Sequence, residues 1–198
     1  MFQIASGIKI PFPEKIKEEY QIINHCIQLN LSFEKIRPLL YDFLEQLEEP
    51  LFFVLQLPLS PQEEAKLRKR DTDPLHQMVS YLDGQTREEI RDILNQYGDL
   101  LLNDGISQFA IASHKTKEEI FIRTYKLINI YCYHPEKFND LLEKYGLNQT
   151  DNLFTIWDTF SNETPGKAYL VTMNGINVYD VYNELVNIGM YDAKIIDD

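Results

Sequence analysis

The sequence predicts an α+β protein with a mainly antiparallel sheet of four to six strands, helices packed largely on one face, and an N-terminal helical hairpin. Three observations carry this prediction. Apolar residues recur at helical spacing in several segments before residue 102. Between residues 103 and 132 a run rich in β-branched and aromatic residues replaces that spacing. Further on, short helical and strand-like segments alternate around Asn174-Gly175, a tight-turn signal.

The length and composition predict one globular domain over residues 1–198. The chain is 44% hydrophobic and 25% charged, which is ordinary for a folded protein. A chain of this size buries roughly 70% of the surface that its unfolded form exposes. Within this domain, we expect residues 1–49 to supply a strand and the helical hairpin.

The N-terminal elements are read from prolines and apolar spacing. Residues 4–10 suit a short edge strand ended by Pro11 and Pro13, and Pro13 also suits the first turn of a helix. The apolar stripe of that helix is Ile16, Tyr20, Ile23 and Ile27. Ser32 suits the N-cap of a second helix. Its expected buried face is Ile36, Leu39, Leu40, Phe43, Leu44 and Leu47. These two helices are the predicted hairpin.

The next segment joins an apolar run to the most polar part of the chain. Residues 51–57 lie between two prolines and favour a short strand. Ser60, followed by Pro61 and Glu63, is a strong helix start. The only basic cluster follows, with Lys66, Arg68, Lys69 and Arg70. We interpret it as a solvated helix or connector, with a patch for phosphate or an acidic ligand as the alternative.

A helix and a hairpin form the predicted centre. Thr86 and Glu89 make a capping box. The stripe that follows is Ile90, Ile93, Leu94, Tyr97 and Leu101. Residues 106–111 and 120–131 are expected to pair as a hairpin around the polar loop 113–117, in the middle of the sheet. The second run is apolar at odd and even positions alike, which favours a strand covered on both faces.

The last third predicts a series of short elements. Helices are expected over residues 135–146, 152–160 and 177–188, because each has a start signal or an apolar stripe. Strands are expected over residues 168–173 and 193–196, the latter at an edge of the sheet.

The charge is the unusual bulk property. There are 31 acidic and 19 basic residues, which gives a net charge of −12. Such a field repels phosphate backbones, so nucleic-acid binding is not expected. It favours a cationic protein partner, and the alternative is that it serves solubility alone.

Targeting signals are lacking in the sequence. The first fifteen residues show no cationic leader before an apolar core, and nowhere do 18 apolar residues run together. Cys26 and Cys132 have no framework spacing that would indicate disulfides. We therefore expect a cytoplasmic protein that is not associated with a membrane.

No familiar cofactor motif occurs. The chain has no Gly-rich phosphate loop, nucleophile elbow or paired-cysteine motif. The one metal-like grouping is His25, Cys26, Cys132 and His134. It lacks paired ligand spacing, so the two cysteines are interpreted as small buried hydrophobes. Neither a cofactor nor a metal is predicted.

The polar loop of the central hairpin holds the catalytic candidates His114, Glu118 and Glu119. A histidine beside a carboxylate suits general acid/base chemistry, because its pKa lies near neutrality. Asp104 lies at the other end of the first strand and is not expected to join them. The alternative is that His114 is an ordinary solvated loop residue.

The C-terminal region holds a candidate binding surface that mixes aromatic and acidic residues. Its members are Phe154, Trp157, Asp158, Tyr179, Asp180, Tyr182, Glu184 and Tyr191. Aromatic anchors ringed by carboxylates suit the capture of a basic partner. The alternative is that Trp157 and about half of the tyrosines belong to the core.

In size, acidity, α+β pattern and lack of a catalytic signature, the chain resembles the small cytosolic immunity proteins of bacterial toxin systems. That resemblance implies a protein that blocks a basic toxin by occupying its active site. Two hypotheses follow. The first is a non-enzymatic, immunity-like binding protein for a basic partner. The second is a hydrolase or transferase that uses His114 with Glu118 or Glu119.

Overall fold

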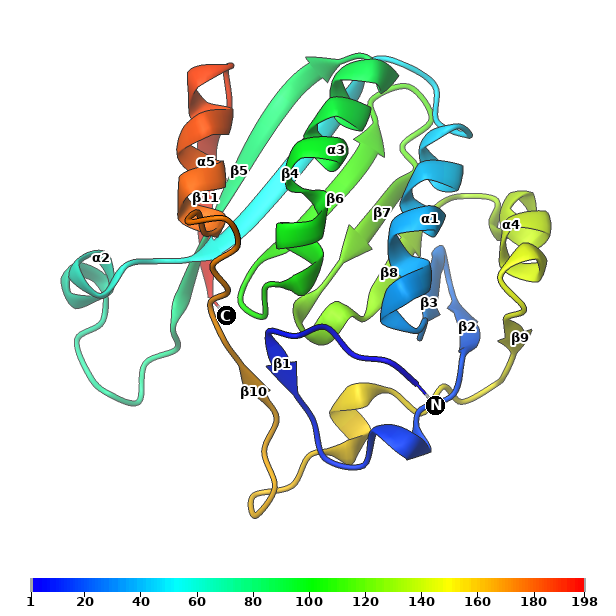
Figure 1. The fold of residues 1–198 in the computed structure, drawn as a ribbon, viewed down its shortest axis with the longest axis horizontal. Helices are drawn as coiled ribbons and strands as arrows, with labels where there is room; N and C mark the ends of the chain where they lie inside the picture. The colour runs from blue at the N-terminus through cyan, green and yellow to red at the C-terminus, as the bar shows by residue number, and fades with distance from the viewer. Residues whose placement is uncertain (1, 198) are drawn as a thin grey trace.

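Nine strands form one large sheet in the computed structural model, which describes residues 2–197 (Figure 1). They are β2 Glu19–Ile23, β3 Cys26–Leu29, β4 Leu51–Pro58, β5 His76–Gln85, β6 Gln108–Ser113, β7 Glu119–Ile122, β8 Ile128–Tyr131, β9 Asn148–Gln149 and β11 Tyr191–Asp197. Their order across the sheet is β11-β5-β4-β6-β7-β8-β3-β2-β9. The sheet is mixed, because β9 runs parallel to β2 while the other neighbours are antiparallel.

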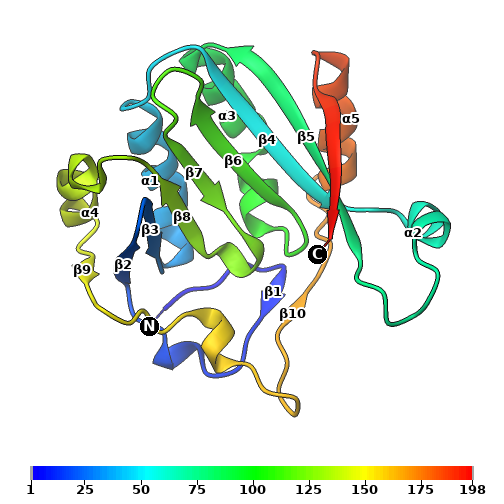
Figure 2. The ribbon, with the colours of Figure 1, turned by 180° about the vertical axis from the view of Figure 1, so that it is seen from behind.

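The helices gather on one side of this sheet. Among the described residues they are α1 Phe33–Leu44, α2 Pro61–Leu67, α3 Arg87–Asn103, α4 Asn139–Lys144 and α5 Val178–Asn187. Figure 1 shows α1, α3 and α5 in front of the strands, whereas Figure 2 shows the strands uncovered from behind. By contrast, α2 and its loop project from the body beside β5. Three helices on one face leave the opposite face open.

The main core lies between the sheet and the three covering helices. Strand residues that point to the helices are fully or almost fully buried, as alternation along a half-covered strand requires. They include Phe53, Leu55, Phe109, Ile111, Ile120, Ile122, Ile128 and Ile130. Phe43 of α1 stacks on Phe138 with ring centroids 5.2 Å apart.

The open face buries its own polar groups. Gln77 Oε1 accepts hydrogen bonds from Gln56 Nε2 at 2.6 Å and from Gln108 Nε2 at 2.9 Å. A second, smaller apolar cluster lies on the same three strands, with Val54, Val79 and Ala110 at its centre and Phe52, Tyr81, Phe121 and Ile196 around it. These side chains cover one another, so the face needs no helix above it.

The α+β class is confirmed, but the predicted N-terminal helical hairpin is wrong. Residues expected in its first helix form β2 and β3, which turn at Asn24 with φ 54°. The helical stripe was a coincidence, since Tyr20 and Ile27 are buried while Ile23 is 51% exposed. Asparagine tolerates left-handed backbone, which favours a tight turn at this position. Of the two helices predicted for the hairpin, only the second exists. It is α1, and it begins after Ser32 as expected.

The prediction of a sheet of four to six strands is also wrong, because nine strands in residues 2–197 form one mixed sheet and two more form a separate sheet. The central hairpin of β6 and β7 is confirmed in the middle of the sheet, with Ile111 opposite Ile120. However, the apolar run over residues 120–131 is two strands, because the chain reverses at Tyr125 and Lys126, whose φ angles are 58° and 61°. The segments β2, β3, β5 and β9 were not predicted as strands at all.

A separate two-stranded sheet, β1 Ile8–Lys9 with β10 Lys167–Ala168, lies below the large sheet in the view of Figure 1. Three backbone segments meet beside it without intervening side chains. Gly7 N–H donates to Asn103 O at 2.8 Å, Tyr169 N–H donates to Gly7 O at 2.8 Å, and Gly105 N–H donates to Tyr169 O at 2.9 Å. This contact ties the chain's beginning to the end of α3 and to the segment before α5.

Lys126 is buried beneath this junction, and its burial sets a pH dependence. Its Nζ donates to Leu101 O at 3.0 Å and Ser107 O at 3.4 Å. Burial lowers the pKa of Lys126 to about 8, and the nearby Asp104 carboxylate offsets only part of that effect. An unfolded lysine has a pKa of about 10.4. The unfolded chain therefore binds more protons above pH 8, so stability should rise with pH from there.

We expect wild type to gain about 1–2 kcal/mol of unfolding free energy between pH 7.5 and 9.5, relative to Lys126→Met. Methionine keeps an unbranched side chain at the same position but has no proton to bind. The measurement is urea unfolding of both proteins at the two pH values. Parallel pH profiles for the two proteins would contradict a depressed pKa at Lys126.

Candidate functional site

His114 lies just after β6, and its partner is a residue that the sequence did not indicate. Its Nε2 is 3.1 Å from Asp83 Oδ1 of β5. The imidazole ring lies against Phe52, with ring centroids 4.5 Å apart. The other oxygen of Asp83 accepts a hydrogen bond from the Tyr191 hydroxyl. Sheet register brings these groups together, because β11, β5, β4 and β6 are neighbours.

The two predicted carboxylate partners of His114 are engaged elsewhere. Glu118 is buried, and Lys137 Nζ donates to its two oxygens at 2.7 and 2.6 Å. Thr116 donates a further hydrogen bond to Glu118 at 2.9 Å. Glu119 is half-buried and lies across from Ala112 in the sheet register. Burial raises the pKa of Glu119. Glu118 thus fixes the hairpin loop to the segment before α4.

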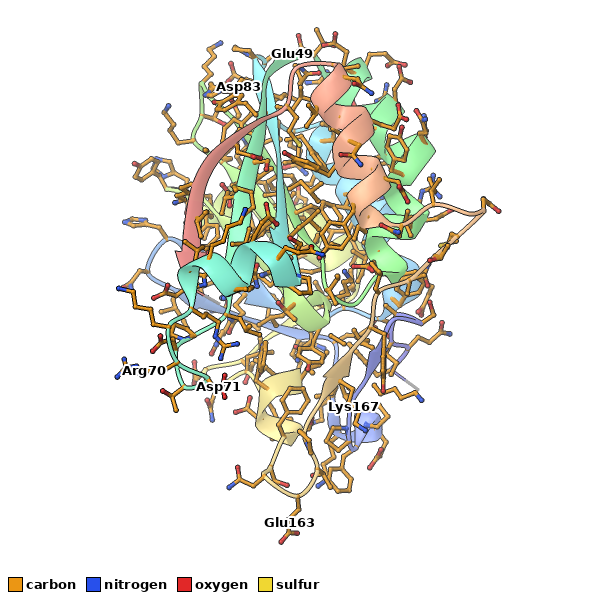
Figure 3. The ribbon with its side chains drawn as sticks, turned by 90° about the vertical axis from the view of Figure 1, so that its left-hand side faces the viewer. Glu49, Arg70, Asp71, Asp83, Glu163 and Lys167 are labelled. Atoms are coloured by element: carbon orange, nitrogen blue, oxygen red, sulfur yellow. The ribbon has the colours of Figure 1, made fainter. Side chains whose placement is uncertain are left out.

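Three cavities in residues 2–197 each lie beside a helix. One is formed by α2 and its loop, another by α3 and α5, and a third by α4 with β2 and β9. His114 and Asp83 line none of these three. Figure 3 labels Asp83 near the top of the molecule, close to Glu49 and far from the α2 loop.

The predicted C-terminal binding residues fall into two regions, one in and beside the short helix over residues 156–159 and the other in α5 and β11. Phe154 and Trp157 lie in the segment over residues 151–166, which is called the lower lobe from its place at the bottom of Figure 1. Their side chains are 42% and 48% exposed. The Trp157 ring contacts Tyr125 and Phe160 edge to face, at 4.9 and 5.4 Å between centroids. Asp158 accepts hydrogen bonds from Thr155 N–H and its hydroxyl, both at 2.7 Å, and so caps the short helix over residues 156–159.

The remaining predicted residues belong to α5 and β11. Asp180 caps α5 by accepting a hydrogen bond from Asn177 N–H at 2.8 Å. Tyr179 donates its hydroxyl to Pro58 O at 3.0 Å. Tyr182 donates to Asp192 Oδ1 at 2.9 Å, and burial, followed by that hydrogen bond, raises the pKa of Tyr182 to about 12. Both tyrosines are half-buried and keep their hydroxyls paired.

A groove of about 430 Å³ runs between α3 and α5, and it includes the predicted residue Glu184. Its apolar lining is Ile93, Tyr97, Leu185 and Ile188, and its polar lining is Gln85, Glu89, Asp92, Gln96 and Glu184. Burial, and to a lesser degree the Glu184 carboxylate, raises the pKa of Tyr97. The charged residues of this lining are Glu89, Asp92 and Glu184, and all three are acidic.

The carboxylates of this groove lack cationic partners. Among residues 2–197, no lysine, arginine or histidine forms an ion pair with Glu89, Asp92 or Glu184. The neighbouring Glu88 is different, because Arg91 Nη1 lies 2.7 Å from it. The sequence did not indicate Glu89 and Asp92 as binding residues, because they flank the apolar stripe of a helix, where polar residues are ordinary. They border a groove only because α5 packs beside α3.

In the basic cluster on α2 and its loop, Arg70 forms an ion pair among the described residues, while Arg68 Nε is buried there without a hydrogen-bond partner. Arg70 lies 3.0 Å from Asp73, whose carboxylate also accepts the N–H groups of Lys69 and Arg70. Arg68 donates to Asp71 O. These residues border a cavity of about 450 Å³, and Figure 3 shows Arg70 and Asp71 on the projecting loop. An anion that binds Arg70 would compete with the Asp73 carboxylate.

No group of three or more His, Cys, Asp or Glu side chains in residues 2–197 is arranged to hold a metal ion. Over the same residues, no helix has both the length and the apolar character to cross a membrane. In comparisons with known proteins, no family model, curated protein or solved structure matches the chain.

Proposed function

We propose that the chain is a non-enzymatic binding protein whose α3–α5 groove holds a basic segment of a partner protein. The observation that carries the proposal is a set of carboxylates without cationic partners on an apolar floor. Glu89, Asp92 and Glu184 border the groove without cationic partners in the described residues, beside buried Ile93 and Leu185. Glu89 among them also accepts hydrogen bonds from Thr86 and so caps α3. A groove with this lining matches an amphipathic segment that carries lysine or arginine beside apolar residues.

The net charge of −12 supports the same proposal over a longer range. A field of this sign attracts a basic protein and accelerates encounter, while the groove supplies the short-range contacts. Occupation of a partner's basic surface would block that surface. This is the mode of action of the immunity proteins that the chain resembles in bulk character.

Two charge reversals in the groove, Asp92→Lys with Glu184→Lys, are expected to weaken binding of a basic peptide about tenfold, as the loss of roughly 1.4 kcal/mol implies. The probe is a fluorescein-labelled helical peptide with lysines along one face, and the measurement is fluorescence anisotropy at low and high salt. Raising the salt should weaken wild-type binding, because exposed charges are screened.

The control variant carries Asp151→Lys with Glu163→Lys in the lower lobe. Both residues are exposed, and the change in net charge is the same as in the groove variant. We expect the control to retain most of the affinity. Equal losses in the two variants would show that only the overall charge matters, and the groove assignment would then be wrong.

A further inference from the structure

A small cavity lies on the other flank of α5, where α2, β4, β5 and β11 meet. It has a volume of about 90 Å³ and is lined chiefly by Leu57, Met78, Tyr179, Tyr182, Glu63 and Asp192. Figure 3 looks onto this junction, with α5 and β11 on either side and α2 crossing below them. Pockets for small molecules are usually roughly 300–1,000 Å³. The space therefore suits a single side chain and not a cofactor.

The two carboxylates of the cavity each have one oxygen engaged and one without a hydrogen bond among the described residues. Asp192 Oδ1 accepts from Tyr182 Oη at 2.9 Å and from Ser80 Oγ at 2.8 Å. Glu63 Oε2 accepts from Ser60 N–H at 2.9 Å and Oγ at 2.6 Å. The Ser60 contacts hold the pKa of Glu63 below its ordinary value, so the carboxylate is ionised at neutral pH. Asp192 Oδ2 and Glu63 Oε1 remain available to a ligand.

The walls between these carboxylates are apolar or aromatic. Leu57 is buried, and Met78 and the two tyrosines are half-buried around the opening. Lysine has a long hydrocarbon stem and a charged tip, and it favours sites where the stem contacts apolar groups while the ammonium meets carboxylates. The volume of about 90 Å³, the apolar walls and the two free carboxylate oxygens all match that side chain.

We propose that this cavity receives one lysine side chain of the partner protein, whose ammonium binds Asp192 and Glu63. The inference deepens the proposed function and rests on it for the identity of the partner. The cavity would fix which residue of the basic segment lies at this point, because it holds one lysine side chain. The α3–α5 groove, by contrast, would bind several basic residues along the segment. A single anchored residue near the centre of an interface is a common source of specificity.

The test is titration of ¹⁵N-labelled protein with N-acetyl-lysine methylamide, followed by NMR. Saturable shifts with a millimolar dissociation constant are expected at the amides of Ser80, Tyr182 and Asp192, because one side chain makes few contacts. N-acetyl-norleucine methylamide has a similar hydrocarbon stem without the charge and should leave these amides almost unshifted. Equal shifts with norleucine, or no saturation up to about 50 mM lysine derivative, would overturn the proposal.

Asp192→Asn should weaken the lysine titration at least fivefold while keeping an oxygen for Tyr182 and Ser80. The matched control is Asp197→Asn on the same strand, whose carboxylate is 75% exposed and does not line the cavity. Affinity within twofold of wild type is expected for the control, and equal weakening in both variants would contradict the assignment.

The same reagents separate this inference from the proposed function. If the basic peptide depends on Asp92 and Glu184 but the lysine derivative does not shift the cavity amides, the groove stands and the lysine site is wrong. If the derivative binds as expected but the groove variant and its lower-lobe control bind the peptide equally, the lysine site stands and the groove proposal is wrong.

Discussion

Gly105→Ala is expected to destabilise the protein by about 3 kcal/mol or more, because the new methyl group would lie inside packed backbone. A Cβ at this position would lie 2.1 Å from Gly7 O and 2.6 Å from Tyr169 N. Both are backbone atoms held by the hydrogen bonds that join the three segments, so no flexible side chain can move aside. Urea unfolding at neutral pH measures the effect.

The control is the same substitution at Gly98, in the interior of α3. There a Cβ would meet only Leu94, at 3.8 Å, which is an ordinary contact. Alanine has the higher helix propensity, so Gly98→Ala should stabilise the protein by roughly 0.5–1 kcal/mol. Opposite signs for the two variants would assign the loss at Gly105 to the close backbone approach. A loss of unfolding free energy below about 1 kcal/mol at Gly105 would mean that the three backbone segments can move apart at little free-energy cost.

Elements with strong local signals were predictable from the sequence. Helix α3 begins after Thr86, as the capping box indicates. The Thr86 hydroxyl accepts a hydrogen bond from Glu89 N–H, and the Glu89 carboxylate accepts one from Thr86 N–H. The turn at Asn174-Gly175 is also confirmed, with φ angles of 52° and 83°. In these segments the residues that define the element are close in sequence, so local patterns carry the information.

Strand β5 was missed because its polar residues resemble a loop. Gln77 and Ser80 interrupt the apolar pattern, yet both are almost fully buried. Their polar atoms bond across the sheet, Gln77 to Gln56 and Gln108, and Ser80 to Asp192. Those partners are distant in sequence, so no local pattern predicts the hydrogen bonds. The error at β2 and β3 had the opposite origin, since a chance helical stripe there outweighed the turn at Asn24.

The candidate sites were predictable only in part, and for the same reason. The acidic and aromatic neighbours of Glu184 along the chain indicate it as a binding residue, whereas Asp92 joins it only through the packing of α5 on α3. In the same way, His114 was a candidate, but Asp83 reaches it through strand register. Composition indicates which residue types gather on a surface, but tertiary contacts determine which of them form one site.

Asp104→Ala is expected to cost about 3–5 kcal/mol of unfolding free energy. The Asp104 carboxylate is fully buried and accepts three backbone N–H groups: Ile106 at 3.0 Å, Ser107 at 2.7 Å and Val171 at 2.9 Å. It is also the carboxylate whose charge favours the protonated form of buried Lys126. Alanine would leave these donors without an acceptor and the ammonium without a compensating charge.

A matched control and a double variant separate these two contributions. Asp99→Ala, on the exposed side of α3, breaks an ion pair with Arg37 at 2.5 Å and should cost less than about 1 kcal/mol, because such pairs are well solvated. Combining Asp104→Ala with Lys126→Met should cost less than the sum of the two single changes, since the unpaired buried charge is absent from the double variant. Strict additivity would show that Asp104 acts through the three N–H groups alone. A loss at Asp104 no larger than that at Asp99 would mean that water reaches the site when the carboxylate is removed.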